Sequence, residues 1–122
     1  MGPLLPRVVA AVGLAFAGLL AWSNQREVAR HDPRRNNGPN DVVLLTAAWC
    51  GYCKAERHAL LAAGVPFREL DVEADGEGRR AYRAVGGRGI PITVIGQDVV
   101  FGFDTRRLNA LLGERGYAVN LQ

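Results

Sequence analysis

The stretch VVLLT at residues 42–46, followed closely by WCGYCK at residues 49–54, decides the fold of this 122-residue chain. The apolar run predicts a buried strand of a parallel sheet, and the residues after it favour a helix. Cys50 and Cys53 are the only two cysteines of the chain. A Cys-x-x-Cys pair at the junction of a strand and a helix is typical of a redox-active dithiol.

Cys50 is expected to be the attacking sulfur, because it falls at the N-terminus of the expected helix. Unpaired backbone N–H groups and the helix dipole favour a thiolate there and lower the thiol pKa, and Lys54 adds a nearby cation. Cys53 lies one turn further in and is expected to act as the resolving thiol. The alternatives are an inert structural disulfide or half of a zinc site. A zinc site needs four ligands, and the only histidines that could complete it are His31 and His58. We therefore expect no metal site, and we expect His58 to be a partly exposed helix residue.

Composition limits the other classes of function. The length allows one domain plus an appendage. The net charge is +3 with 15 basic residues, which weakly favours anionic partners such as lipid headgroups. These residues are scattered and form no nucleic-acid-binding motif, so we expect no nucleic-acid partner.

An apolar segment at residues 1–25 is expected to lie outside the folded domain. It carries no charge after Arg7, and residues 8–22 are almost wholly apolar. This length lies between that of a signal-peptide core and that of a membrane span, so both remain open. Ala21 and Ser23 are spaced like a cleavage site, whereas Trp22 at an interface position favours an anchor. A buried core helix is a third alternative.

We favour a transmembrane anchor in the inner or cell membrane, because the uncharged stretch reaches Gln25. The side of the membrane stays open. Arginines are in excess just after the segment, which places the domain in the cytoplasm by the positive-inside rule. Cleavage as a signal peptide would instead release the domain to the periplasm.

The rest of the chain divides into a polar linker at residues 26–41, a domain at 42–115 and a short tail at 116–122. The domain alternates strand and helix signals, in the order β-α-β-α-β-β-α. The first two strands are parallel because a helix connects them, and the last two form a hairpin around residues 96–98. The expected strands are 42–46, 66–72, 92–95 and 99–101, and the expected helices are 53–63, 75–85 with Asp75 as its cap, and 104–112 with Asp104 or Thr105 as its cap.

Pro91 follows Ile90 at the start of the third strand, where a backbone donor is dispensable. In this topology the position faces the helix terminus that carries Cys50. We expect a cis Ile90–Pro91 bond, although X–Pro bonds are usually trans.

Residues 42 to about 112 resemble the glutaredoxins. The matching pieces are the Cys50-Gly51-Tyr52-Cys53 centre, the stretch Arg88-Gly89-Ile90-Pro91 where the family has Arg-Thr-Val-cis-Pro, and the turn Gly102-Phe103-Asp104. Thioredoxin is a near neighbour, but it carries an additional strand and helix that the polar linker cannot supply. The resemblance implies a three-layer thioredoxin-like α/β fold, with a four-stranded mixed sheet flanked by helices.

The resemblance also implies a thiol–disulfide oxidoreductase that transfers electrons between thiols and disulfide-bearing or glutathionylated proteins, with glutathione as co-substrate. Cys50 would take the glutathionyl group, and a second glutathione or Cys53 would release it. Tyr52, Arg88, Ile90 and Pro91 would line the glutathione site. The Phe103 and Asp104 amides at a helix start would hold its carboxylate.

Two departures from the family pattern leave other functions open. Ala47 stands where many glutaredoxins have a lysine, and Gly89 stands where they have a threonine. The turn before the last helix also resembles glutaredoxin-like electron donors that thioredoxin reductase recharges. The alternatives are therefore a reductase-coupled or extracytoplasmic disulfide-exchange module, or a module that holds a [2Fe–2S] cluster with glutathione.

Overall fold

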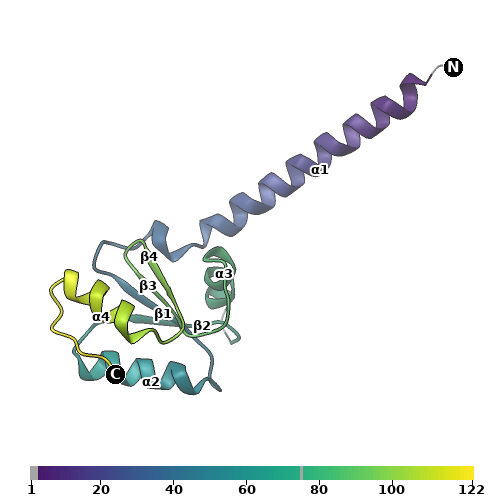
Figure 1. Ribbon diagram of the computed structural model, residues 1–122. Coiled ribbons are helices and arrows are strands. Elements are labelled where there is room, and N and C mark those ends of the chain that lie inside the picture. Colours follow the sequence, from purple (N-terminus) through teal and green to yellow (C-terminus); the bar gives the residue numbers. More distant parts are fainter. Residues whose placement is uncertain (1–2, 75) are drawn as a thin grey trace.

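The computed structural model describes residues 3–74 and 76–122 of the chain. A long helix, α1 (Leu4–Arg30), projects from a small α/β domain (Figure 1). The short 3-10 helix η1 (Pro33–Arg35) follows it, before the first strand of the domain. The elements of the domain are β1 (Val42–Thr46), α2 (Gly51–Ala62), β2 (Arg68–Asp71), α3 (Gly76–Ala84), β3 (Ile92–Ile95), β4 (Asp98–Phe101) and α4 (Thr105–Glu114).

The four strands form one mixed sheet in the order β2-β1-β3-β4. β1 pairs with β2 in parallel, and Leu45 lies opposite Leu70. β1 pairs with β3 in antiparallel fashion, and Leu45 also lies opposite Ile92. β3 and β4 form the expected hairpin. The predicted order β-α-β-α-β-β-α and the mixed four-stranded sheet are therefore confirmed.

Helices cover both faces of the sheet, because alternate strand residues point to opposite sides. Leu44 of β1 packs with Leu60 of α2 and Leu108 of α4 in one core cluster. Val43 and Leu45 of the same strand pack with Ala81 of α3 on the other face. The molecule thus has three layers, with α2 and α4 on one side and α3 on the other (Figure 1).

Some element boundaries differ from those expected. β2 begins at Arg68 rather than at residue 66, since Pro66 has no N–H to give to the ladder. α2 begins at Gly51, so Cys53 lies within its first turn. It ends before Gly64, whose φ of +69° favours glycine. The expected cap of α3, Asp75, lies outside the described residues.

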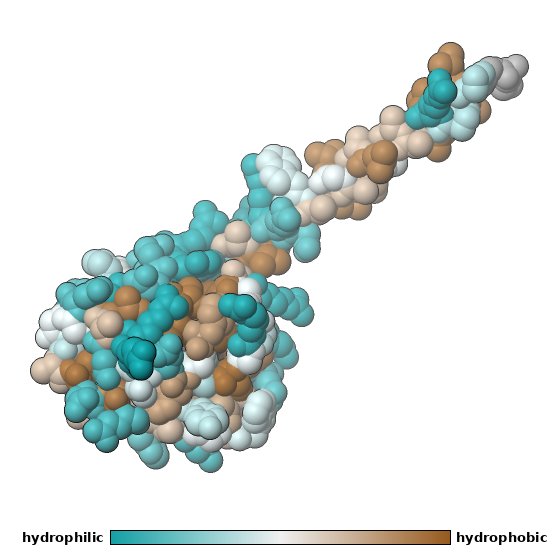
Figure 2. All heavy atoms as spheres, viewed as in Figure 1, coloured by the Kyte–Doolittle hydropathy of each residue, from teal (hydrophilic) through white to brown (hydrophobic). Residues whose placement is uncertain are grey.

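α1 continues to Arg30, beyond the boundary expected near residue 25. Residues 26–29 are Arg-Glu-Val-Ala, which contain no glycine or proline to stop a helix. No residue of α1 is buried, and hydrophobic residues lie along its length in Figure 2. This helix is long and apolar enough to cross a membrane.

The rest of the expected linker lies against the domain. Pro33 is buried, the Asn37 side-chain amide donates to the Gly96 carbonyl at 3.4 Å, and the Gln97 amide donates to the Arg34 carbonyl at 2.7 Å. α1 also contacts α3. Residues 31–41 therefore attach the helix to the domain through defined contacts.

Candidate active site

The strand register brings three separate parts of the chain to one edge of the sheet. β1 ends at Thr46 and leads directly to Cys50. Because β3 runs antiparallel and begins with Ile92 opposite Leu45, Pro91 lies at that same edge. Phe101, at the end of β4, lies opposite Ile92, so the turn to α4 is there as well.

Cys50 is the N-cap residue of α2. It has an extended backbone with φ −83° and ψ 110°, and its Sγ accepts a hydrogen bond from the Cys53 backbone N–H at 3.1 Å. The two cysteines form a disulfide with their Cα atoms 5.2 Å apart. An N–H group aimed at the Cys50 sulfur also favours negative charge on that sulfur when the disulfide opens.

The two sulfurs differ in their surroundings. Cys50 is 4% exposed and Cys53 is 0% exposed. Next to them, Trp49 is 69% exposed and Tyr52 is 72% exposed. The Trp49 ring nitrogen donates to the Glu73 carboxylate at 2.9 Å, which ties the β1–α2 connection to the loop after β2. Lys54 is exposed in the first turn of α2, and His58 is exposed further along it.

The Ile90–Pro91 peptide bond is cis, as expected. Pro91 is fully buried and Ile90 is half-buried. The Pro91 carbonyl accepts from the Gly102 N–H at 2.8 Å, which holds the turn before α4 against the start of β3. The Arg88 guanidinium lies over the Phe101 ring, 4.6 Å from its centroid.

Phe103 and Asp104 lie between β4 and α4. Phe103 is half-buried and packs against the core cluster beneath α4. Asp104 is the N-cap of α4, as expected, and its carboxylate accepts from the Arg107 N–H at 3.1 Å. The N-terminus of α4 is therefore at the same edge of the sheet as the N-terminus of α2.

The structure adds a buried polar pair that the sequence analysis did not identify. Glu56 of α2 and Thr93 of β3 are both 0% exposed, and the Thr93 hydroxyl donates to the Glu56 carboxylate. Burial raises the pKa of Glu56 to about 7, and the hydrogen bond from Thr93 opposes part of that rise. The one signal in the sequence was the spacing, since Glu56 follows Cys53 by three residues.

A second polar group lies where β1 meets β2. The Arg57 guanidinium and the Thr46 hydroxyl both donate to the Glu69 carboxylate, and Arg57 holds the pKa of that carboxyl below its usual value. These side chains line a hollow of about 360 Å³ next to Ala47. Glu69 is therefore an ordinary ionised carboxylate, unlike Glu56.

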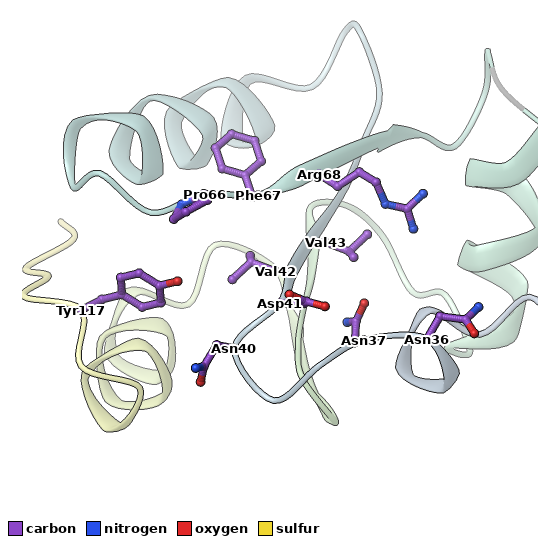
Figure 3. Close-up of a pocket in the computed structure, with 10 residues that line it drawn as sticks. All are labelled: Asn36, Asn37, Asn40, Asp41, Val42, Val43, Pro66, Phe67, Arg68 and Tyr117. Atoms are coloured by element: carbon purple, nitrogen blue, oxygen red, sulfur yellow. The ribbon is translucent and has the colours of Figure 1, made fainter.

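Another hollow lies at the opposite end of the sheet (Figure 3). It measures about 470 Å³ and is lined by the starts of β1 and β2, by Tyr117 and by residues of the segment after η1. It contains neither cysteine. Within residues 3–74 and 76–122, no three His, Cys, Asp or Glu side chains group as metal ligands would.

The site can open and close one disulfide, with one sulfur at a helix terminus and the other buried behind it. Such a pair accepts two electrons when it opens and gives two when it closes. This chemistry, on a mixed sheet with the dithiol and a cis-proline at one edge, defines a thiol–disulfide oxidoreductase with a thioredoxin-like fold.

Comparison with known families makes the assignment more specific. Residues 42–100 match the family model of glutaredoxin, so this part of the chain is similar to that family. A comparison with curated protein sequences found no match.

Solved structures agree with this assignment. The glutaredoxin-like NrdH-redoxin from Escherichia coli is 28% identical, with a TM-score of 0.53, over 58% of this chain and 93% of that one. The thioredoxin-like protein BC3987 is 29% identical, with a TM-score of 0.56, over 59% of this chain and all of that one. A buckwheat glutaredoxin–glutathione complex, at 21% identity and a TM-score of 0.53 over 81% and 91% of the two chains, shares the fold.

Proposed function

We propose that this protein reduces disulfides in other proteins, including mixed disulfides with glutathione, through the Cys50–Cys53 pair. The observation that carries the proposal is the convergence of Cys50, the cis Ile90–Pro91 bond and the start of α4 at one edge of the sheet. A thiolate at this edge meets an extended peptide that can pair with backbone groups beside the proline. Cys50 attacks, and Cys53 closes the disulfide that releases the product.

Glutathione is the co-substrate that we propose first. Its carboxylates fit the N-terminus of α4, where the Phe103 and Asp104 amides lie, because helix N-termini favour anions. The exposed Tyr52 ring provides an apolar wall, and the Arg88 guanidinium lies over the Phe101 ring at the end of β4. Ile90 provides backbone groups for pairing with an extended tripeptide.

A reductase-supplied dithiol is a second candidate for the source of electrons. Ala47 provides no charge where a lysine would assist an anionic ligand, and Gly89 provides no hydroxyl beside the proline. The similarity to the NrdH-redoxin, whose published description states a thioredoxin-like activity profile, supports this candidate. This candidate is tested by asking whether thioredoxin reductase reduces the Cys50–Cys53 disulfide directly.

We also propose that α1 anchors the domain to a membrane. The helix has 27 residues and would reach about 40 Å at about 1.5 Å per residue, more than the ~30 Å hydrocarbon core of a bilayer. The Arg26 guanidinium lies 3.6 Å from the centroid of the Trp22 ring, and both side chain types suit the interface between lipid and water.

The test of the oxidoreductase proposal is turnover of a glutathionylated protein by the full-length chain in detergent micelles, with glutathione as reductant. We expect turnover by the unmodified chain and none by Cys50→Ser, which lacks the attacking sulfur. Cys53→Ser should keep part of its glutathione-dependent activity, because a second glutathione can release the mixed disulfide. Activity in Cys50→Ser equal to that of the unmodified chain would contradict the proposal.

A further inference from the structure

The Glu56 carboxyl is buried on the same face of α2 as Cys53 of the active-site disulfide. α2 buries three residues on one face, namely Cys53, Glu56 and Leu60. Residues three apart on a helix are neighbours, with Cβ atoms about 5–6 Å apart. Cys53 and Glu56 are both 0% exposed. Glu56 is therefore the next buried residue along α2 after the resolving cysteine.

The hydrogen bonding of this carboxyl is incomplete. The Thr93 hydroxyl donates to Oε1, whereas Oε2 is buried and has no hydrogen-bond partner among residues 3–74 and 76–122. A buried acceptor without a donor costs about 1–3 kcal/mol, and native proteins retain few of them. A proton donor that is present at only one stage of the reaction would explain why this one is retained.

Few charged groups face the carboxyl from the elements around it. On α2, Lys54 is exposed and Arg57 is bonded to Glu69 of β2. Asp104, the cap of α4, is exposed and bonded to the Arg107 N–H. Asp98 of β4 is on this face of the sheet as well, and its carboxylate accepts from the Arg115 guanidinium at 3.0 Å. The buried side chains on this face of the sheet and of α4 do not titrate: Val42, Leu44, Thr46, Thr93, Ile95, Val100, Leu108 and Leu112.

Cys53 needs a proton acceptor when it acts as the resolving thiol. The nucleophile is the thiolate, and burial in apolar surroundings raises the pKa of a thiol. Solvent does not reach Cys53, which is 0% exposed. Glu56 is the one other titratable side chain on the buried face of α2.

We propose that Glu56 accepts the proton of the Cys53 thiol when Cys53 attacks the mixed disulfide on Cys50, and returns it when the disulfide is reopened. This inference rests on the proposed function, since it assigns the proton transfer of that reaction. No part of it depends on which thiol recharges the protein.

The steps balance in atoms and electrons. The Cys50 thiolate attacks a substrate disulfide, and the first substrate sulfur leaves as a thiolate. The Cys53 thiol then gives its proton to the Glu56 carboxylate, its sulfur bonds to the Cys50 Sγ, and the second substrate sulfur leaves with the electron pair of the broken bond. The dithiol is oxidised by two electrons and the substrate disulfide is reduced by two.

The reverse direction uses the same proton. A reducing thiolate attacks the Cys50 Sγ, which is the more exposed sulfur, and Cys53 leaves as a thiolate. The Glu56 carboxylic acid protonates it. Burial raises the pKa of Glu56 to about 7, so both of its protonation states are available at neutral pH, as a group that both accepts and returns a proton requires.

The two sulfurs can be observed separately with an aromatic disulfide whose thiolate product is coloured. The first burst of colour reports attack by Cys50, and the second reports closure by Cys53. With the reduced full-length chain in detergent micelles, Glu56→Gln should leave the first phase unchanged and slow the second by about a hundredfold at neutral pH. The rate of the second phase should rise with pH through about 7 in the unmodified chain and lose this inflection in Glu56→Gln.

Glu114→Gln is the matched control, because it makes the same change at an exposed position on α4. It should leave both phases unchanged. A second phase in Glu56→Gln with the rate and pH profile of the unmodified chain would overturn the inference. Absence of a fast first phase in the unmodified chain would instead overturn the proposed function, so the two failures are distinguishable.

Thr93→Val tests the same point if Glu56→Gln does not fold. Loss of the Thr93 hydroxyl removes the hydrogen bond that holds down the pKa of Glu56. The inflection of the second phase should therefore move to higher pH in Thr93→Val. An inflection at the same pH in Thr93→Val and in the unmodified chain would overturn the inference.

Discussion

Burial of the Glu56 carboxyl makes the stability of the folded domain depend on pH. Its pKa rises from an ordinary value of 4.5 to about 7 because burial disfavours the charged form. Between these two values the folded chain binds more protons than the unfolded chain. The contribution of Glu56 to stability is therefore complete below pH 4.5 and is lost as the pH rises to about 7.

We predict that the free energy of unfolding falls by about 3 kcal/mol more in the unmodified chain than in Glu56→Gln when the pH rises from about 4.5 to 8. Glutamine keeps an acceptor for Thr93 but does not titrate. Urea unfolding of both chains across this range measures the difference, and it cancels the opposite contributions of Glu69 and Asp71, whose pKa values are lowered. Parallel curves for the two chains would show that Glu56 does not titrate on folding.

The sequence pointed to Cys50 and Cys53 as candidate reacting residues but did not point to the pair formed by Glu56 and Thr93, for a physical reason. Cys50 and Cys53 lie three residues apart, so their spacing and the strand before them were sufficient to predict the site. Glu56 and Thr93 are 37 residues apart, and their contact exists only once α2 has packed on β3. A glutamate next to Arg57 is also compatible with a solvated helix face. Which face of α2 packs against the sheet is seen only in the folded structure, and that face buries Glu56.

At the scale of the elements, α3 packs unusually close to the end of β2. A Cβ atom on Gly78 would lie 2.0 Å from the Asp71 carbonyl oxygen. Gly78 is buried near the start of α3, and Ala81 one turn later packs into the core below the sheet. The absence of a side chain at Gly78 therefore allows this helix to cover its face of the sheet.

Gly78→Ala should lower the free energy of unfolding by about 1–3 kcal/mol, because the Asp71 backbone must move to relieve the clash. Gly113→Ala in α4 is the matched control, since no atom lies within 4 Å of its added Cβ. That change should raise stability by up to about 1 kcal/mol through helix propensity. Chemical denaturation measures both values, and equal effects at the two glycines would contradict this account of α3.

The order and type of the elements followed from the alternation of apolar runs and glycine or proline breaks. Their boundaries depended on contacts that a linear pattern does not contain. β2 is shorter than expected because its ladder with β1 begins at the pair Val43–Arg68. α1 is longer than expected because the first proline after Pro6 is Pro33. The cis bond before Pro91 was expected from the motif, and not from the proline alone.

At the scale of the whole molecule, α1 and the helix that carries Cys50 lie on opposite sides of the sheet. α1 leaves the domain on the side of α3, whereas α2 lies on the opposite side of the sheet (Figure 1). Hydrophilic residues gather where α1 meets the domain (Figure 2). Under the proposed anchoring by α1, a domain attached in this way presents Cys50 to soluble partners.

We predict that the full-length chain stays with the membrane pellet after alkaline carbonate extraction. A chain without residues 1–30 should move to the supernatant, because the apolar surface of α1 is then absent. Immunoblots of both fractions measure the distribution. Release of the full-length chain, or a mature N-terminus at Asn24, would contradict the anchor and support a cleaved signal peptide.

The central claim is that Cys50 ionises readily because it caps α2. Ultraviolet absorbance of the thiolate, recorded during a pH titration of the reduced full-length chain, tests it most directly, since Cys50 and Cys53 are the only sources of that signal. We predict one ionisation well below the pKa of an ordinary free cysteine, retained in Cys53→Ser and absent from Cys50→Ser. Ionisation of both thiols only at or above that ordinary pKa would contradict the account.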